Sequence, residues 1–206
     1  MSPTASEIVT SPLVPLPSPL PRGFYARPTA EVARDLIGKL LVQPGRPAHV
    51  ARIVEVEAYL GERDAASHAR RGPTPRAAMM FGPPGFLYVY LIYGIHHCMN
   101  IVTELDGEAG AVLIRGAEPL RGFETTAGER LLTGPGKVCA ALGITRRHNG
   151  LDLCGPIMFV AEDDGAPPPR VKRSARIGVA YAAAWAARKL RFYIPGNPHV
   201  SGRPRD

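Results

Sequence analysis

Two glutamates within one short apolar run are the first residues whose spacing suggests chemistry. Residues 53–59 read Ile-Val-Glu-Val-Glu-Ala-Tyr, and their β-branched residues predict a strand. Because side chains alternate along a strand, one face is expected to carry Ile53, Glu55, Glu57 and Tyr59. Acidic side chains are mostly exposed in proteins, so the strand taken alone favours two solvated acids. On a partly buried face, however, such a carboxylate is a candidate general base.

Aromatic residues follow in the next stretch that favours β-structure. Tyr88 and Tyr90 share one face by the same alternation, and Tyr93 lies on the opposite face next to a glycine. Taken singly, a tyrosine usually packs in a core with its hydroxyl at the rim. Together with Tyr59 and His68, however, these rings are typical of a site that stacks on a flat, π-rich ligand such as a nucleobase.

The run His96-His97-Cys98, with His68 upstream, raises the question of a metal site. Adjacent side chains on a strand point apart, so the run cannot bind one ion together, and the sequence has no CxxC or HxxxH pair. We therefore predict no metal site, and a small metalloenzyme built on these residues is an alternative that metal analysis tests. Asn100 shares a face with His96 and Cys98, either as a satisfied core amide or as a group that reads a ligand edge.

Arg115 closes the predicted apolar strand that starts at Ala111. It is either a solvated strand end or, beside a nucleic acid, a phosphate ligand. The chain has 25 basic and 18 acidic residues and a formal net charge of +7. Arginine greatly outnumbers lysine, and its planar guanidinium suits bidentate contacts with phosphate. The composition is therefore consistent with a polyanionic partner, although net charge alone also serves solubility.

Composition and missing motifs exclude several functional classes. The 206 residues, of which 45% are hydrophobic, fit one globular domain. No apolar run is long enough to cross a bilayer, and the N-terminus lacks the basic-then-apolar order of a secretory signal. Three scattered cysteines do not indicate a disulfide framework, so we expect reduced thiols and a cytoplasmic protein. Neither a GxxxxGK[ST] loop nor a GxGxxG turn occurs, so a nucleotide cofactor has no support.

The elements expected to carry these residues are mostly short strands. The first 22 residues are rich in proline, so we expect a disordered or extended tail at 1–22, one domain at 23–202 and a short C-terminal tail at 203–206. The expected strands are 39–43, 49–59, 85–101 with a bulge or bend at Gly94, 111–115, 157–161, 176–180 and 191–194. The expected helices are 29–36, 75–82, 134–142 and 181–188. Many strands with few long helices predict the α+β class.

Taken in order, these motifs resemble one enzyme family, the alkyladenine (3-methyladenine) DNA glycosylases. The resemblance extends from about residue 24 to residue 201, and it implies a single mixed domain around a curved, largely antiparallel sheet with short flanking helices. The stretches that carry it are RIVEVEAYLG (52–61), TPR (74–76), MFGPPGFLYVYLIYG (80–94), CMNIV (98–102), VLIRGAEPL (112–120), LLTGPGKVC (131–139), ARIGVAYA (175–182) and LRFYIPGNPHVS (190–201).

The resemblance implies catalytic and base-binding roles for five of the candidate residues. Glu57 would act as the general base that deprotonates the attacking water, and Arg115 would lie beside that water and the phosphate of the lesion. Tyr59, His68 and Tyr90 would form the walls that stack on the extruded base.

Two further roles follow from the same resemblance. Tyr93 would be the wedge that fills the gap left in the duplex, and Asn100 would be the gate that clashes with the exocyclic amine of normal guanine. The chain departs from the family pattern after Tyr93-Gly94, where it has Ile95, His96 and His97 instead of bulky apolar or aromatic residues.

The implied function is base-excision repair of duplex DNA. The enzyme would flip alkylated or deaminated purines out of the double helix and hydrolyse the N-glycosidic bond with a water activated by Glu57. No lysine has to attack, so we expect a monofunctional enzyme without a lyase step. We also expect a monomer that needs no metal or organic cofactor and has no membrane partner. The alternative from another class is a non-catalytic nucleic-acid-binding protein, which would leave Glu57 without a purpose.

Overall fold

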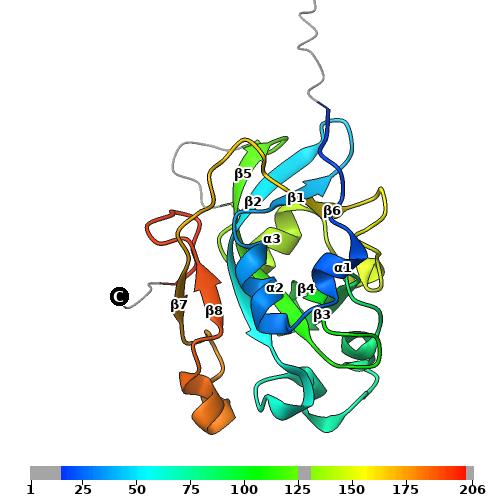
Figure 1. Cartoon of the computed structure of the whole chain (residues 1–206), viewed down its shortest axis with the longest axis vertical. Helices are drawn as coiled ribbons and strands as arrows, with labels where there is room; N and C mark the ends of the chain where they lie inside the picture. The colour runs from blue at the N-terminus through cyan, green and yellow to red at the C-terminus, as the bar shows by residue number, and fades with distance from the viewer. Residues whose placement is uncertain (1–14, 125–130, 203–206) are drawn as a thin grey trace, which may run out of the picture.

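An antiparallel sheet of eight strands curls around the helices α2 and α3 and forms the frame of the molecule (Figure 1). The computed structural model describes residues 15–124 and 131–202. Within them the helices are α1 (Arg22–Tyr25), α2 (Thr29–Leu36) and α3 (Pro135–Ala141). The strands are β1 (Leu40–Gln43), β2 (His49–Tyr59), β3 (Leu87–Ile92), β4 (His96–Val102), β5 (Ala111–Arg121), β6 (Phe159–Ala161), β7 (Lys172–Ser174) and β8 (Arg191–Tyr193). This architecture confirms the predicted α+β class.

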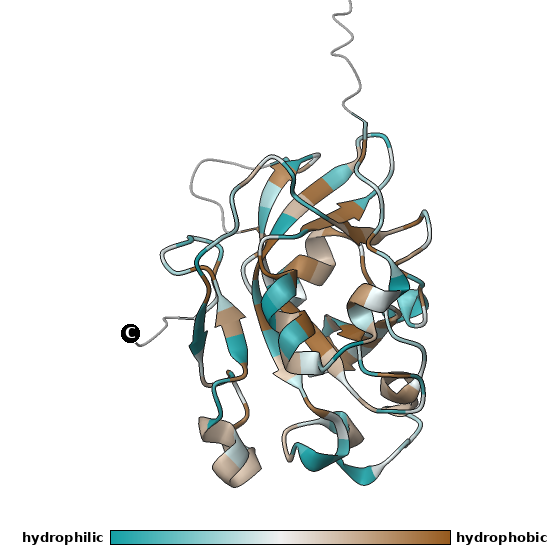
Figure 2. Ribbon diagram, in the orientation of Figure 1, coloured by the Kyte–Doolittle hydropathy of each residue, from teal (hydrophilic) through white to brown (hydrophobic). Residues whose placement is uncertain are grey.

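Short 3-10 turns complete the described chain. They are η1 (Gly61–Arg63), η2 (His68–Arg71), η3 (Ala78–Phe81), η4 (Arg146–His148) and η5 (Ala180–Ala187). Helix α2 buries Val32, Ala33 and Leu36, as the spacing of its apolar residues predicts. Figure 2 shows hydrophobic residues concentrated on the strands and on α3, while the loops at the edge of the molecule are mostly hydrophilic. The main core therefore lies between the curled sheet and the helices.

Strand β2 is the central element because it changes partner along its length. The main path of the sheet runs β3-β4-β5-β2-β1-β6, and β8 joins β2 beyond the end of β1. The first half of β2 pairs with β1, and Glu55 to Glu57 pair with β8, while β5 follows the other edge throughout. A β-bulge between Ile53 and Glu55 marks the change. The two acids lie on the second half, between β5 and β8.

Two predictions for this strand are wrong, and the bulge explains the first. Ile53 packs in the main core with Val56 and Ala58 and does not share a face with the acids, because a bulge inserts one residue and reverses the alternation. The acids are not solvated either, since Glu55 and Glu57 are 0% exposed. The acids are in contact with segments far along the chain, namely those that contain Ile177, Arg191 and Ser201.

The predicted β-stretch 85–101 forms a hairpin of β3 and β4. Tyr93 and Gly94 form its turn with φ angles of 53° and 72°, and the Ile95 N–H donates to the Ile92 carbonyl oxygen. Positive φ at both central residues is typical of hairpin turns, although a tyrosine there is uncommon. The predicted bend at Gly94 is therefore a complete chain reversal, with Tyr93 at its tip.

Four of the predicted elements differ from the structure, and the first is the helix predicted at 75–82, which forms only the 3-10 turn η3 at Ala78–Phe81. Strand β5 extends to Arg121, so Arg115 lies in its middle and not at its end. No strand forms at 176–180, and the strand that pairs with β8 is instead β7, a few residues earlier. The stretch predicted as a helix at 181–188 forms the 3-10 turn η5, with non-helical angles at Ala182 and Ala183.

The N-terminal tail predicted at 1–22 is described only from residue 15, and residues 1–14 lie outside the described part, as do the predicted tail residues 203–206. Its last residues lie against the domain: Leu20 is buried, and its N–H donates to the Val160 carbonyl oxygen on β6. None of the helices in the described ranges is long and apolar enough to cross a membrane.

Candidate active site

The carboxylate of Glu57 is held by two strong donors and faces an arginine. Its Oε2 accepts a hydrogen bond from the Tyr59 hydroxyl at 2.9 Å, and its Oε1 accepts one from the Ile177 backbone N–H at 2.7 Å. Arg115, which reaches across from β5, lies 3.5 Å from each of these oxygens. Glu57 is therefore fixed in position by groups from three separate segments.

Burial and neighbouring charges act on Glu57 in opposite directions. Desolvation is the largest effect and raises the pKa of this carboxyl, and the nearby Glu55 raises it further. The Arg115 cation, the Ile177 N–H and the Tyr59 hydroxyl stabilise the ionised form and lower the pKa, but they only partly offset the burial. A carboxylate with a raised pKa is a stronger base than an exposed one, which suits proton abstraction from water near neutral pH.

Next to Glu57 lies a cavity of about 390 Å³ with aromatic walls. His68 meets the Tyr90 ring edge-on with 4.6 Å between centroids, and the Tyr88 and Tyr90 rings are 5.4 Å apart. Residues that line the cavity include Tyr59, His68, Tyr88, Tyr90, Asn100, Arg115, Ile177 and Tyr181. Flat rings around a space of this kind are suited to stacking on a planar ligand.

His68 is a neutral wall of this cavity. Burial, helped by the charge of Arg76, lowers the pKa of its imidazole to about 4. One ring nitrogen, Nδ1, shares a 2.8 Å hydrogen bond with the Tyr88 hydroxyl. Because the ring carries no charge at neutral pH, it does not repel a cationic ligand that stacks against it.

Asn100 lies on β4 beneath the aromatic walls and is only 3% exposed. Its Nδ2 donates a 3.1 Å hydrogen bond to the Tyr88 carbonyl oxygen on the neighbouring strand. The side chain is therefore fixed in orientation by the backbone of β3 while it lines the cavity. A fixed amide at the wall can reject a ligand whose polar groups do not match it.

Tyr93 stands at the rim of the same cavity and is 86% exposed. Ile95, two residues later on the same turn, is 71% exposed. Large apolar side chains rarely project so far from a protein without a partner. The tip of the β3–β4 hairpin is therefore available to insert into another molecule.

A buried ion pair supports the back of the Tyr59 ring. The guanidinium of Arg176 lies 4.7 Å from the ring centroid and also donates to the Ala58 carbonyl oxygen at 2.8 Å. Its two terminal nitrogens bind the carboxylate of Asp64, and both side chains are wholly buried. Because Asp64 lies on the segment that leads to His68, this pair ties two walls of the cavity together.

Sequence comparisons assign the chain to a family. The profile of the methylpurine-DNA glycosylase family matches residues 23–198, which is most of the chain. The chain belongs to this family. The match confirms the resemblance drawn from the motifs, and it shows that the protein is a DNA glycosylase, a hydrolase of DNA repair that acts on DNA.

Three similar relatives of this glycosylase are each named as a 3-methyladenine DNA glycosylase. The Anaeromyxobacter dehalogenans (strain 2CP-1 / ATCC BAA-258) protein is 54% identical over 189 residues, or 90% of this chain and 86% of that protein. The Myxococcus xanthus protein is 50% identical over 186 residues, or 90% and 94% of the two chains. The Methanocella arvoryzae protein is 50% identical over 193 residues, or 89% and 96%.

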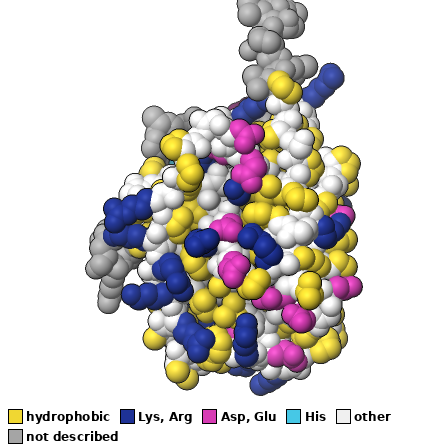
Figure 3. Space-filling model, in the orientation of Figure 1, with side chains coloured by type: hydrophobic (Ala, Val, Ile, Leu, Met, Phe, Trp, Pro, Cys, Tyr) yellow, Lys and Arg dark blue, Asp and Glu magenta, His cyan; other side chains and the backbone are white. Residues whose placement is uncertain are grey.

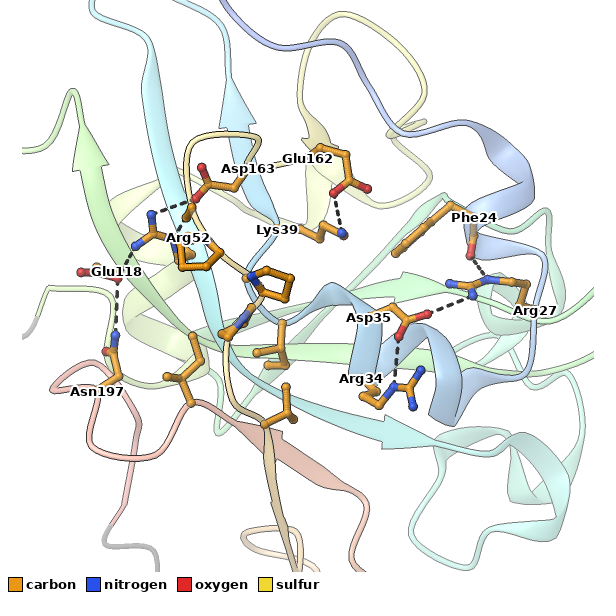
Figure 4. A pocket seen from close by; sticks show the side chains of 18 residues that line it. Phe24, Arg27, Arg34, Asp35, Lys39, Arg52, Glu118, Glu162, Asp163 and Asn197 are labelled. Carbon is orange, nitrogen blue, oxygen red and sulfur yellow. Dashed lines mark hydrogen bonds and ion pairs between the residues drawn. The ribbon is translucent and has the colours of Figure 1, made fainter.

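The glycosylase also has a larger hollow, of about 820 Å³, which shares no lining residue with the aromatic cavity (Figure 4). Charged side chains line it and pair with one another: Lys39 with Glu162, and Arg52 with both Asp163 and Glu118. Most of these side chains are partly exposed. None of the sequence-predicted site residues lines this hollow.

The structure brings the sequence-predicted site residues of the glycosylase together. Tyr59, His68, Tyr90, Asn100 and Arg115 line one cavity, Glu57 lies behind it in contact with Tyr59 and Arg115, and Tyr93 stands at its rim. Among the described residues, no three His, Cys, Asp or Glu side chains are grouped as metal ligands would be.

Sequence reasoning missed several residues that complete the site. Tyr88 was singled out together with Tyr90, but its hydrogen bond with His68 was not predicted. Ile177 contributes only its backbone N–H, which no residue type reveals. Arg176 and Asp64 were not singled out, because a buried ion pair between residues so far apart has no local pattern.

Proposed function

We propose that this glycosylase hydrolyses the N-glycosidic bond of damaged purines with a water activated by Glu57, without a lyase step. The observation that supports this best is the wholly buried carboxylate of Glu57, held between Tyr59 and Ile177 beside an aromatic cavity. Such a carboxylate takes a proton from water and also stabilises the oxocarbenium-like state of glycosidic cleavage. The cavity supplies the place for the departing base.

Access to the bond requires that the nucleotide leaves the stack. Rotation of a purine out of the duplex costs a few kcal/mol of unstacking and unpairing, least where damage has weakened the pair. Stacking against Tyr59, His68 and Tyr90 returns roughly 1–3 kcal/mol per base–aromatic contact. The exposed Tyr93 at the hairpin tip fills the vacated space in the duplex and offsets part of the remaining cost.

The charge of the lesion favours alkylated purines over normal ones. Purines alkylated at N3 or N7 carry a positive charge, which aromatic faces attract and the neutral ring of His68 does not repel. In this proposal Asn100, whose amide donates to the Tyr88 carbonyl oxygen, rejects the exocyclic amine of normal guanine. Selectivity thus comes from both attraction to the lesion and exclusion of the normal base.

The covalent step needs no amine nucleophile. Among the described residues that line the cavity there is no lysine, so no Schiff base with the sugar forms there. Water attacks the anomeric carbon, Glu57 accepts its proton, the glycosidic electron pair leaves with the base, and an abasic site remains. The strand stays intact, so the enzyme is monofunctional.

The segment that contributes Tyr181 to the cavity lining carries positive charge, which suits duplex DNA. Residues 165–202, which include Tyr181 on the cavity lining, contain several Lys and Arg but no Asp or Glu. Figure 3 shows Lys and Arg side chains gathered on the side of the molecule formed by β7 and β8. Cationic groups here bind phosphates and release counterions, which gives affinity that does not depend on sequence.

The deciding experiment is single-turnover base release by Glu57→Gln from a duplex that carries 7-methylguanine or 3-methyladenine. The amide keeps the size of the side chain but cannot accept the proton of water, so we expect release to fall by about 10²- to 10⁴-fold while binding to lesion DNA persists. Asp163→Asn, in the larger hollow, is the matched control and should release bases at the wild-type rate. Release by Glu57→Gln at a rate similar to that of the wild type would remove Glu57 from the mechanism.

A further inference from the structure

A second carboxylate, Glu55, is buried beside the base and has no role in the proposed reaction. It is 0% exposed and lies one alternation before Glu57 on β2. Its Oε1 accepts hydrogen bonds from Arg115 Nε at 3.2 Å, Arg191 Nε at 2.6 Å and the Ser201 hydroxyl at 3.0 Å. Its Oε2 accepts the Ser201 N–H at 2.5 Å. Burial of this carboxylate together with two guanidiniums has a cost in desolvation free energy, which the four hydrogen bonds offset.

Arg115 connects Glu55 with Glu57. This guanidinium donates to Glu55 through Nε, to the Ser201 hydroxyl through Nη2 at 3.2 Å, and to Glu57 through Nη1 at 3.5 Å. The contacts with Glu55 and Ser201 are shorter than those with Glu57. Glu55 and Ser201 therefore fix where the arginine stands, and the arginine faces Glu57 without closing tightly on it.

The backbone of β5 is adapted to this arrangement. Gly116, directly after Arg115, pairs with Glu55 across the sheet. A Cβ at this position would lie 2.6 Å from the His199 carbonyl oxygen and 3.3 Å from the Glu55 side chain. Only glycine lets the segment that contains Ser201 and the side chain of Glu55 pack together over the strand.

The charges of this cluster balance only when both acids are ionised. Two carboxylates, Glu55 and Glu57, face two guanidiniums, Arg115 and Arg191, and all four side chains are nearly or wholly buried. Arg191 also donates to the Ser201 carbonyl oxygen at 2.6 Å and to the Ser174 hydroxyl at 3.2 Å, so it is fixed beside Glu55. Without the charge of Glu55, both guanidiniums would act on Glu57 alone.

We propose that Glu55 is a positioning residue for the general base: it holds Arg115 at a set distance from Glu57 and, neutralised by Arg191, leaves Glu57 as a strong base. This inference rests on the proposed role of Glu57 in water activation. Glu55 touches neither the cavity nor the reacting atoms, and it acts only through Arg115 and through its charge.

Other titratable groups also face Glu57, and the test must hold them constant. They come from β2, β4, β5 and the segments that pack on them, and they are Tyr59, Cys98, Arg115 and Arg176 with its partner Asp64. All of them keep their identity in the variants below. A shift in pH dependence therefore reports the change at Glu55 or Arg191.

The experiment measures the acid limb of single-turnover base release, over pH 5 to 9, from duplex DNA carrying 7-methylguanine. In Glu55→Gln, Glu57 loses a repelling neighbour and gains the full attraction of Arg115, so we expect the limb to move to lower pH by about one unit. The plateau rate should fall by about tenfold or more, because a less basic carboxylate is a weaker proton acceptor.

Arg191→Gln should have the opposite effect on the limb. It leaves the charge of Glu55 without its neutralising partner, so Glu57 becomes harder to ionise and the limb moves to higher pH. Arg191→Lys keeps the charge and should return the limb close to its wild-type position. Val160→Ala on β6, remote from the cluster, is the control for lost stability and should leave the limb unchanged.

Opposite shifts in Glu55→Gln and Arg191→Gln support the inference, and an unmoved limb or shifts in the same direction overturn it. If Glu55→Gln does not fold, Arg191→Gln compared with Arg191→Lys decides the question alone. Failure of the proposed function is a separate result, since Glu57→Gln would then still release bases. Failure of this inference alone leaves Glu57→Gln inactive while the limb in the other variants stays in place.

Discussion

The aromatic cavity and the larger hollow of this glycosylase differ in the solvent exposure of their charged side chains. The larger one, of about 820 Å³, is lined by ion pairs that reach the solvent, such as Arg52 with Glu118, whose side chains are 25% and 32% exposed. The smaller one, of about 390 Å³, is lined by aromatic rings and backed by Glu57, which is 0% exposed. Exposed pairs are worth little, whereas a buried charge must be held by specific partners.

The comparison shows that the cavity to which we assign the reaction is not the larger of the two, so volume alone would have selected the other one. A buried carboxylate is maintained at a cost in stability, and such a cost is typical of sites where the group does chemistry. Most charged groups of the larger hollow pair with one another, for example Lys39 with Glu162 and Arg52 with Asp163 (Figure 4). Substitutions that are matched between the two hollows should therefore have very different effects.

The largest difference is expected between Arg115→Met and Arg52→Met. Arg115 lies between two buried acids, so its loss should cost about 3–5 kcal/mol of stability and raise the pKa of Glu57 further. Base release at pH 7 should fall at least about 100-fold and recover partly as the pH rises. Arg52→Met should lower the free energy of unfolding by about 1 kcal/mol or less and leave base release unchanged.

Urea unfolding and single-turnover release over a pH series measure both effects. Circular dichroism at each pH confirms that the Arg115 variant is folded under the assay conditions. Equal losses of activity in the two variants would break the distinction between the hollows.

A second comparison concerns one aromatic side chain from each hollow. It sets the affinity of Tyr90→Leu for lesion DNA against that of Phe24→Leu. Tyr90 stacks on the extruded base in our proposal, so its loss should weaken binding to lesion DNA by about 10- to 100-fold, the value of one base–aromatic contact. Phe24 lines the larger hollow, and its replacement should leave lesion binding unchanged.

Fluorescence anisotropy with a lesion duplex, in a Glu57→Gln background that prevents turnover, gives these affinities. An undamaged duplex is the internal control, because no base occupies the cavity and both variants should bind it like the parent. If Tyr90→Leu weakens binding to damaged and undamaged DNA equally, the ring contacts the backbone and not the base.

Local patterns were sufficient to predict the elements that frame the site. The bounds of α2 and β2 match the predictions because the spacing of apolar residues in the first and the β-branched run in the second are properties of neighbouring residues. The site residues on these and the following strands could be selected because their types are unusual there. Glu57 and the tyrosine pair of β3 were singled out as candidates in this way, and the family resemblance supplied the role expected of Glu57.

Contacts between distant segments could not be predicted. The bulge after Ile53 exists because β2 exchanges β1 for β8, and β8 lies more than 130 residues later. The stretch around Ile177 was predicted as a strand, but its N–H binds Glu57 instead of a neighbouring strand. Arg115 was placed at a strand end, whereas β5 continues through Gly116, where the absence of a side chain permits a close approach of the segment around His199.

The smallest effect expected is a gain in stability in Glu57→Gln. Burial raises the pKa of Glu57 in the folded protein above its value in the unfolded chain, so the ionised form is the less favourable one in the fold. Wild-type stability therefore decreases as the pH rises through the folded pKa, and below the unfolded pKa this group has no such cost. The amide mimics the neutral acid at every pH.

Glu57→Gln should accordingly equal the wild type at pH 4 and exceed it by about 1 kcal/mol at pH 8, as is common when a functional group is removed from its site. Asp163→Asn in the larger hollow should show no gain at either pH, because its carboxylate is paired with Arg52 near the solvent. Urea unfolding of the three proteins at both pH values measures this. A Glu57→Gln protein less stable than the wild type at pH 8 would mean that the buried carboxylate stabilises the fold, and the difference between the two hollows would then lie in their aromatic residues alone.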